Sequence, residues 1–375
     1  MNAQDGTHRI LIVGGGIAGL AAAIALSRRG DDVEVAELNT DWSVAGWGLS
    51  LTGPALRALD SLGLADVCAD HGFGISNVTN CDSAGETMTT IDMPRLLGPE
   101  RPAQAGLSRA VLHRILREEA VAQGVVLRTG VTADRLDESG DTVDVLLSDG
   151  SRRSVDVVVG ADGIRSRTRD LLGVPYELEY TGQMVWRAIV PRPAWATALY
   201  TFAGPVYTGG LIPISQTQAY AFLTEDGVPP DPLPDKQLAD RMRELMADFT
   251  GRVVAVREAV TDPEAVVRRP VQTCLVDGPW HRGRTVLIGD AVHAPSPQLV
   301  SGAALAIEDA VILAEELHRG DDTETALKAF GRRRLERSRL VVGISVRVSE
   351  LVRDGHHTEA HQLQQQCHRA LAEPA

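Results

Sequence analysis

Hydrophobic and polar positions in the first 40 residues predict a strand, a helix and a second strand. The run Ile10 to Val13 is apolar and has the length of one buried strand. Leu20 to Leu26 is apolar and rich in alanine, a composition that favours a helix. Val33 to Ala36 follow as the second strand, and Glu37 ends it. We expect the rest of the chain to be organised around this unit.

Three glycines between the first strand and the helix, Gly14, Gly16 and Gly19, form the pattern G-x-G-x-x-G. Gly14 permits a sharp turn, Gly16 leaves the backbone open to a pyrophosphate, and Gly19 permits close packing of the helix on the sheet. The helix start offers unpaired N–H groups to an anion, and Glu37 lies where a carboxylate can accept hydrogen bonds from ribose hydroxyls. The stretch predicts a dinucleotide site; a glycine-rich turn without a ligand is the alternative.

Apolar periodicity predicts most of the remaining elements. Helices are expected at 51–64, 109–123 (with Ser108 as its cap), 235–249, 303–317 and 327–351, and a further polar helix towards residue 370. Strands are expected at 125–128, 135–136, 142–147, 154–159, 184–190, 198–202, 219–223 and 285–288, with a hairpin-like segment over 77–90. A solvated face is expected for five arginines of the long helix: Arg332, Arg333, Arg334, Arg337 and Arg339.

A buried strand that runs into a glycine turn occurs twice more, before Gly160-Ala161-Asp162-Gly163 and before Gly289-Asp290. If the three strands belong to one sheet, the nucleotide-binding domain is discontinuous. The strand-like pieces after residue 176 alternate with Pro and Gly and predict an antiparallel sheet inserted into that domain. The predicted fold is therefore α/β, with a discontinuous Rossmann-like domain, an inserted antiparallel-sheet domain and C-terminal helices that bridge the two.

Composition narrows the functional classes. The length of 375 residues exceeds what one core usually holds and predicts two domains. The net charge of −13 argues against nucleic acid or an anionic membrane as a partner, and no apolar run approaches the roughly 20 residues of a membrane span. Four scattered cysteines without a C-x-x-C pair fit a reducing cytoplasm. The ten histidines show no ligand spacing such as H-E-x-x-H, so no metal is expected.

Three motifs stand in order along the chain: GGGIAG with Glu37, GADGIRSRTR at 160–169, and GRTVLIGDAVHAPSP at 283–297 followed by IEDA at 307–310. Together they resemble the FAD-dependent aromatic hydroxylases of the para-hydroxybenzoate hydroxylase type, which are single-component flavoprotein monooxygenases. The similarity spans nearly the whole chain, and it looks nearest to the salicylate-hydroxylase and tetracycline-inactivating branches. It implies an FAD-binding domain at 1–75, 106–175 and 271–325, a substrate domain at 76–105 and 176–270, and C-terminal helices at 326–375.

The resemblance also implies where FAD binds. The three glycines of the first turn would hold the pyrophosphate, Glu37 the adenosine ribose, and Arg109 the phosphate region. Asp162 and Gly163 match the motif linked to both FAD and the pyridine nucleotide, and Asp290 matches the acid that accepts from the ribityl chain. Further FAD contacts are expected at Ile17, Ala18, Gly48, Val131, Gly289, Pro297, Gly302 and Ala303.

The last of these residues lie beside the expected isoalloxazine ring, where a helix N-terminus would stabilise negative charge on reduced flavin. The family often has G-Q-G here, whereas this chain has Val300-Ser301-Gly302, and valine does not easily take a positive φ. Leu38 replaces a frequent basic residue after the ribose acid. Trp47 has two interpretations: it lines the active site, or it only packs behind the sheet.

The implied reaction is hydroxylation of a small aromatic, heteroaromatic or polyketide-like substrate, with NAD(P)H and O2 as co-substrates and a flavin C4a-hydroperoxide as the oxidant. Arg187, Tyr207 and Tyr220 are candidates for the substrate pocket; the alternatives are an ion pair for Arg187 and core packing for the two tyrosines. The alternatives are a dehydrogenase or epoxidase on the same fold, or a flavin-binding protein without turnover. The expected partner is a small molecule, with no nucleic acid or membrane, and the chain is expected to be a monomer or homodimer.

Overall fold

A six-stranded sheet forms the centre of the N-terminal domain in the computed structural model, which describes residues 7–42, 47–320 and 322–375. Its strand order is β18-β19-β12-β1-β2-β8, and all neighbours are parallel except β18 and β19. The strands are β1 (Arg9–Val13), β2 (Asp32–Glu37), β8 (Val126–Thr129), β12 (Val157–Gly160), β18 (His281–Arg282) and β19 (Thr285–Leu287). The three strands that precede glycine turns, β19, β12 and β1, are thus neighbours, and their carboxyl ends meet at one edge.

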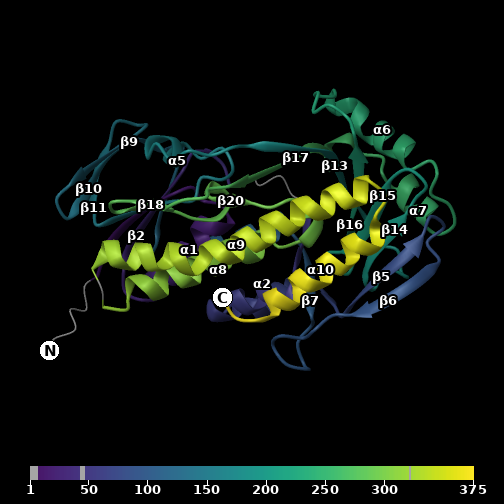
Figure 1. Cartoon of the computed structure of the whole chain (residues 1–375), viewed down its shortest axis with the longest axis horizontal. Coiled ribbons are helices and arrows are strands. Elements are labelled where there is room, and N and C mark those ends of the chain that lie inside the picture. Colours follow the sequence, from purple (N-terminus) through teal and green to yellow (C-terminus); the bar gives the residue numbers. More distant parts are fainter. Residues whose placement is uncertain (1–6, 43–46, 321) are drawn as a thin grey trace.

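The two faces of this sheet are covered differently (Figure 1). Ile10 and Ile12 of β1 pack in the cluster that contains α1 (Ile17–Ser27), α4 (Arg109–Ala122) and α8 (Gly302–Leu317). Leu11 and Val13 point to the other face, where they pack against a small sheet of β9 (Ala133–Ser139), β10 (Thr142–Leu147) and β11 (Arg152–Val155). Burial of both faces explains why these parallel strands are continuously apolar.

The prediction of a single strand at 154–159 is wrong. It is two strands in two sheets, because β11 ends at Val155 and β12 begins at Val157. Asp156 lies at the break, where its carboxylate accepts hydrogen bonds from the backbone N–H of Arg9 (2.7 Å) and from the Arg9 guanidinium (2.8 Å). The apolar run around Asp156 gave no sign of this change of sheet.

The second large sheet is mainly antiparallel, as predicted, with the strand order β20-β17-β13-β16-β15-β14-β5-β6. Its strands are β5 (Asn77–Asp82), β6 (Thr87–Asp92), β13 (Glu179–Pro191), β14 (Leu199–Ala203), β15 (Thr208–Pro213), β16 (Gln218–Asp226), β17 (Val266–Leu275) and β20 (His293–Ala294). The predicted hairpin at 77–90 forms its edge and pairs with β14 in parallel. The α/β class, with one parallel and one inserted antiparallel sheet, is confirmed.

One face of the eight-stranded sheet is covered by α6 (Leu238–Leu245) and α7 (Val253–Glu258), around a core that contains Trp186, Met242 and Phe249. The other face turns towards the N-terminal domain. A three-stranded sheet of β3 (Gly48–Leu51), β4 (Phe73–Ile75) and β7 (Gln104–Ser108) lies against it. The helix predicted at 51–64 is two helices, α2 (Gly53–Ser61) and α3 (Ala65–His71), and the one predicted at 235–249 ends earlier, with α6.

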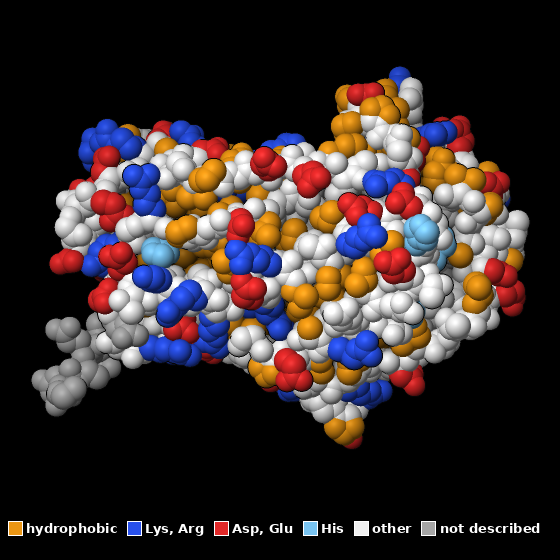
Figure 2. Space-filling view, viewed as in Figure 1, with side chains coloured by type: hydrophobic (Ala, Val, Ile, Leu, Met, Phe, Trp, Pro, Cys, Tyr) orange, Lys and Arg blue, Asp and Glu red, His pale blue; other side chains and the backbone are white. Residues whose placement is uncertain are grey.

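Two C-terminal helices complete the fold: α9 (Thr323–Arg353) and α10 (His357–Ala372). Figure 1 shows α9 running along both domains, and it contacts α8 as well as β17. On the face in Figure 2, acidic and basic side chains are interspersed along these helices. The prediction of a solvated face on α9 is wrong for Arg334, because its side chain is fully buried.

No helix in the described parts of the chain combines the length and apolarity that crossing a bilayer requires.

Candidate active site

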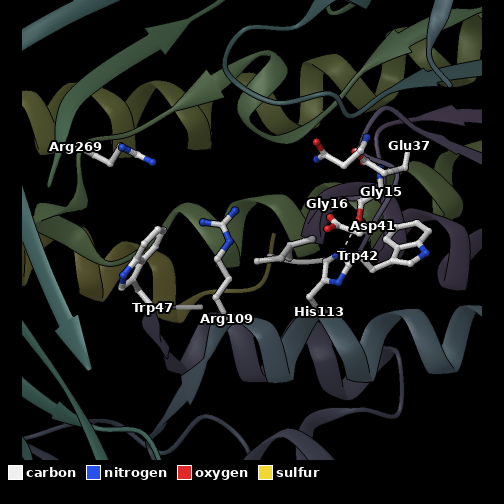
Figure 3. A pocket seen from close by; sticks show the side chains of 11 residues that line it. Gly15, Gly16, Glu37, Asp41, Trp42, Trp47, Arg109, His113 and Arg269 are labelled. Carbon is white, nitrogen blue, oxygen red and sulfur yellow. Dashed lines mark hydrogen bonds between the residues drawn. The ribbon is translucent and has the colours of Figure 1, made fainter. Parts of the chain in front are cut away.

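A cleft of about 390 Å³ opens at the edge where the glycine turns meet (Figure 3). Its lining comes from the first glycine turn, the end of β2, the residues after it, α4 and β17. Figure 3 shows Arg269 entering from one side and Glu37 with Gly15 lying on the other. The lining residues are Gly15, Gly16, Ile17, Glu37, Asn39, Asp41, Trp42, Trp47, Arg109, His113 and Arg269.

The three glycines of the first turn differ in what a side chain at each position would meet. Gly14 has a φ of 107°, and a Cβ there would lie 2.4 Å from the carbonyl oxygen of Ala161. A Cβ on Gly19 would lie 1.9 Å from the oxygen of Gly14, so the helix packs directly on the turn. A Cβ on Gly16 would meet nothing within 4 Å. Only Gly16 therefore faces open space, which leaves room for a ligand against the backbone.

The turn is held from two sides. Glu37 Oε2 accepts a hydrogen bond from the backbone N–H of Gly15 (2.7 Å), and its Oε1 accepts one from the N–H of Asn39 (2.8 Å). On the other side, Nε2 of the buried His113 lies 2.7 Å from the carbonyl oxygen of Gly15. Burial lowers the pKa of His113, so the neutral ring donates to this oxygen. Sequence reasoning missed His113, although it lies one helical turn after Arg109.

Asp162 closes the second turn. Its carboxylate accepts hydrogen bonds from the hydroxyl of Ser166 and from the backbone N–H and hydroxyl of Thr168 (2.8 and 2.9 Å). Ser166 in turn caps α5 (Arg167–Leu171). Gly163 has a φ of 82° and faces open space. These contacts fix the turn that follows β12, the neighbour of β1 in the sheet.

Arg169 connects the second motif with the third. Its guanidinium is fully buried and donates to the carbonyl oxygens of Ala291 and Ile164, both at 2.8 Å. The ring of Tyr176 lies 3.4 Å from the guanidinium carbon. One arginine of GADGIRSRTR thus holds the G-D turn in place across more than 100 residues of sequence.

The third turn carries an exposed acid. Gly289 has a φ of 60°, and a Cβ on it would lie 2.8 Å from the Cβ of Ala18. Asp290 follows in a single 3-10 turn (Gly289–Ala291), and it is exposed. The surrounding protein raises the pKa of Asp290 by desolvation, and the charges of His293 and Arg109 oppose this rise. A polar ligand that donates to this carboxylate would stabilise its charged form.

The loop before α8 contains Val300-Ser301-Gly302, at the position where the family often has G-Q-G. Pro297 begins a 3-10 turn (Pro297–Leu299), and Val300 follows with a φ of 51° and a ψ of 32°. Valine therefore does adopt the left-handed conformation, in which β-branched residues are strained. Gly302 begins α8, whose N-terminus has no side-chain cap. The backbone N–H groups of this helix start are thus available to an acceptor, as they are at α1.

A family model described as an FAD binding domain matches residues 7–345 of the chain. YetM of Bacillus subtilis (strain 168), whose name places it among FAD-dependent monooxygenases, is 32% identical over 369 residues, covering 97% of this chain and 99% of that protein. The chain belongs to the FAD-dependent monooxygenases. The resemblance stated from the three motifs is confirmed. The first turn fits an FAD-binding protein, because the start of α1 has no side-chain cap and Gly16 beside it faces open space in the cleft.

Two further relatives of this FAD-dependent monooxygenase are informative. The 2-heptyl-3-hydroxy-4(1H)-quinolone synthase of Pseudomonas aeruginosa (strain UCBPP-PA14) is 32% identical over 311 residues, which are 81% of this chain and 79% of that enzyme. The crystal structure of Klebsiella pneumoniae HpxO complexed with FAD and uric acid superposes with a TM-score of 0.83 and 27% identity, covering 97% of this chain and 92% of that chain. Both names refer to compounds built on nitrogen heterocycles.

Two of the predicted substrate residues of the monooxygenase lie together on the inner face of the eight-stranded sheet. Arg187 belongs to β13 and Tyr220 to the neighbouring strand β16, where Arg187 pairs with Phe222, two positions from Tyr220, so the two side chains share one face of the sheet. Burial raises the pKa of Tyr220, and Arg187 opposes the rise. Tyr207 lies apart from them, because it packs in the cluster on the opposite face with Phe249 and α6.

Residues around this pair connect it with the cleft. Gly48 of β3 packs directly on Tyr220, since a Cβ on Gly48 would lie 2.5 Å from the Cβ of Tyr220. Trp47 lines the cleft and also packs against the cluster that contains Tyr220, so its side chain lies between the two. Val131 lies outside the cleft lining: it is buried behind β2, and its N–H donates to the carbonyl oxygen of Glu37. Its contact with FAD stays a prediction.

Proposed function

We propose that this flavoprotein is an NAD(P)H-dependent hydroxylase of a small heteroaromatic substrate. The observation that carries the proposal is the placement of Arg187 and Tyr220 on one face of the eight-stranded sheet, beside the apolar side chains of Ile212, Ile214 and Phe222. A flat ring fits such a face, and its polar substituent can pair with the guanidinium and the phenol. The quinolone and uric acid in the names of the relatives are rings of this kind.

Residues of the cleft would hold FAD as the family pattern predicts. The backbone around Gly16 and the N-terminus of α1 would bind the pyrophosphate, and Glu37 the ribose. Asp290 would accept from the ribityl hydroxyls. When bound, FAD supplies the redox chemistry by which O2 is split and one oxygen atom enters the substrate. The start of α8 would stabilise negative charge on the flavin.

The protein's own part in the reaction is positioning and protection from water. Burial raises the pKa of Tyr220, so its hydroxyl stays protonated near neutral pH and can hold a substrate oxygen. Arg187 would stabilise the negative charge that develops when a hydroxyl or amide group of the substrate ionises. Trp47 closes the space between this face and the cleft and would exclude water from it.

A second hollow supports NAD(P)H as the reductant. It measures about 430 Å³ and is lined by Asp162, Ile164, Arg165, Arg269, Pro270 and Gln272. Arg269 also lines the first cleft, so the two hollows adjoin. Two arginines beside an open cleft suit the phosphates of a nucleotide that binds transiently. The cytoplasmic location and the monomeric or homodimeric state stay predictions.

The test is a screen of the FAD-loaded protein with NADH and NADPH. Quinolones, hydroxypyridines, purines and phenols would be added singly, and consumption of the nicotinamide and of O2 would be followed. The proposal expects one ring class to stimulate both, with a product heavier by one oxygen atom, which NMR then assigns as a hydroxylation or an epoxidation. A product that has only lost hydrogen would favour a dehydrogenase. A yellow protein that no ring stimulates would favour a flavin-binding protein without turnover.

A further inference from the structure

Three side chains from distant parts of the sequence meet at the edge of the parallel sheet opposite the cleft. His8 precedes β1, Asp31 precedes β2, and His318 follows α8. Nδ1 of His8 lies 3.2 Å from Oδ1 of Asp31, and Nε2 of His318 lies 3.3 Å from the same oxygen. Within the described residues, these are the three that could hold a metal ion, and their ligand atoms all lie within 4.8 Å of one another.

The hydrogen bonds of His318 fix which nitrogen faces Asp31. Its Nδ1 lies 2.9 Å from the carbonyl oxygen of Ala314, which can only accept, so Nδ1 carries the proton. In the neutral ring, Nε2 then presents a lone pair to the carboxylate oxygen. Two acceptors face each other across 3.3 Å, and a cation between them would turn this repulsion into two bonds.

Asp31 is the buried centre of the cluster. Its side chain has no exposed surface, and its Oδ2 has no hydrogen-bond partner in the part of the chain that the structure describes. Nε2 of His318 is likewise buried without a hydrogen bond. A buried carboxylate oxygen left without a partner is costly. The side chains of His8 and His318 are 23% and 19% exposed, which leaves an approach from solvent.

We propose that His8, Asp31 and His318 bind one Zn²⁺ ion through Nδ1, a carboxylate oxygen and Nε2. Zinc bonds of about 2.0–2.1 Å place tetrahedral ligands about 3.3–3.4 Å apart, and the two measured separations match this. Two imidazoles and a carboxylate are ligands that zinc prefers, and water can take the fourth position. The hydrogen bond from His318 to Ala314 is the outer contact that usually orients a metal-bound imidazole.

The ion would act as a structural staple. It joins the chain before β1, the turn before β2 and the end of α8. At their other ends, β1 leads into the first glycine turn and α8 begins at Gly302. The site lies at the amino ends of β1 and β2, so the ion would take no part in the chemistry of the cleft. Asp156 adds negative charge near His8, and Arg284 opposes it.

The test uses the full-length, FAD-loaded protein without a histidine tag. After treatment with a chelator and its removal, Zn²⁺ is titrated by calorimetry at pH 7.5, and bound zinc is measured by elemental analysis after gel filtration. About one tight equivalent per chain is expected, with a rise in melting temperature. His318→Gln and Asp31→Asn should each weaken binding by about tenfold or more. His71→Gln, which changes an exposed histidine on α3, is the matched control.

FAD content and the melting temperature in chelator show whether each variant is folded. Tight binding that survives in His318→Gln or Asp31→Asn would overturn the proposal. A wild-type protein that binds no zinc would also overturn it. Loss of tight binding in both variants, with binding intact in His71→Gln, would support the site.

Discussion

Nε2 of His293 lies 2.7 Å from Oδ2 of Asp309, and both side chains are completely buried. The same Oδ2 accepts the backbone N–H of Gly289 at 2.8 Å, and Oδ1 accepts Nε of the buried Arg334 at 2.7 Å. Burial alone would raise the pKa of Asp309, but His293, Arg334 and these hydrogen bonds outweigh it and lower the pKa. The acid of the IEDA segment therefore anchors the turn that carries Asp290.

Replacing Asp309 should destabilise the protein and loosen the flavin. Asp309→Asn keeps the shape but leaves the buried Arg334 without one of its two carboxylate partners, which costs about 3–5 kcal/mol in comparable buried pairs. Urea unfolding measures the loss, and the fraction of FAD retained on gel filtration measures the effect on the turn. Glu315→Gln removes a partly exposed partner of Arg333 and should cost no more than about 1 kcal/mol. Equal losses in the two variants would contradict this role.

Gly16 and Gly19 should respond differently to alanine. Gly19→Ala places a Cβ 1.9 Å from a backbone oxygen, so α1 must move away from the turn, and the FAD-free protein should lose several kcal/mol, on the scale of overpacked cores. Gly16→Ala adds a methyl group in open space, so the FAD-free protein should melt within a few degrees of the wild type. Its FAD affinity should still fall by about tenfold or more, because the methyl group occupies the path of the pyrophosphate. Unchanged FAD affinity in Gly16→Ala would show that the pyrophosphate does not approach there.

The local features of the cleft were predictable from spacing. The roles of the three glycines follow from their distances along the chain, and the neighbouring positions of Asp162 and Asp290 follow from strands of one parallel sheet that end in similar turns. The break at Asp156 was hidden, because apolar residues continue on both sides of it. Strand β17 was hidden for the opposite reason: Arg268, Arg269 and Pro270 interrupt its apolar pattern, and proline argues against a strand.

Contacts between distant segments could not be predicted. His113 meets Gly15 across 98 positions, and nothing around either residue marks the pair. Arg334 belongs to a run of arginines that reads as a charged surface. Its burial follows from Glu308 and Asp309, which α8 presents to the same place. A helical period tells which residues share a face, but it does not tell which face meets a carboxylate on another helix.

The left-handed Val300 should be a source of strain. A non-glycine residue in this conformation costs roughly 1–2 kcal/mol, and glycine avoids the cost but loses about 0.4–1 kcal/mol through the freer unfolded chain. Val300→Gly should therefore raise the free energy of unfolding by up to about 1 kcal/mol. Val300→Ala keeps a Cβ at this φ and should gain less. Urea denaturation of the three proteins distinguishes them, and a destabilised Val300→Gly would show that the loop accommodates valine without strain.

Removing the hydroxyl of Tyr220 should weaken substrate binding and leave the flavin unchanged. Tyr220→Phe keeps the ring that packs on Gly48, so the fold should be intact. Loss of one hydrogen bond of about 1 kcal/mol corresponds to a roughly fivefold rise in KM. Tyr207→Phe is the matched control on the opposite face of the sheet and should leave KM unchanged. A rise in KM for Tyr207→Phe instead would reassign the substrate face.

The stabilisation by zinc should grow as pH rises. In chelator, the hydrogen bond to Asp31 raises the pKa of His8, so its stabilisation is complete below the ordinary histidine pKa of about 6.5 and is lost as pH rises through the raised value. Zinc requires neutral imidazoles, so its stabilisation grows as pH rises over the same range. Burial lowers the pKa of His113, His281 and His368, and these groups titrate alike with zinc and with chelator. The difference in urea midpoint between zinc and chelator should therefore be larger at pH 8 than at pH 6. His8→Gln should remove most of this increase, and a difference that does not grow with pH in the wild type would contradict the metal site.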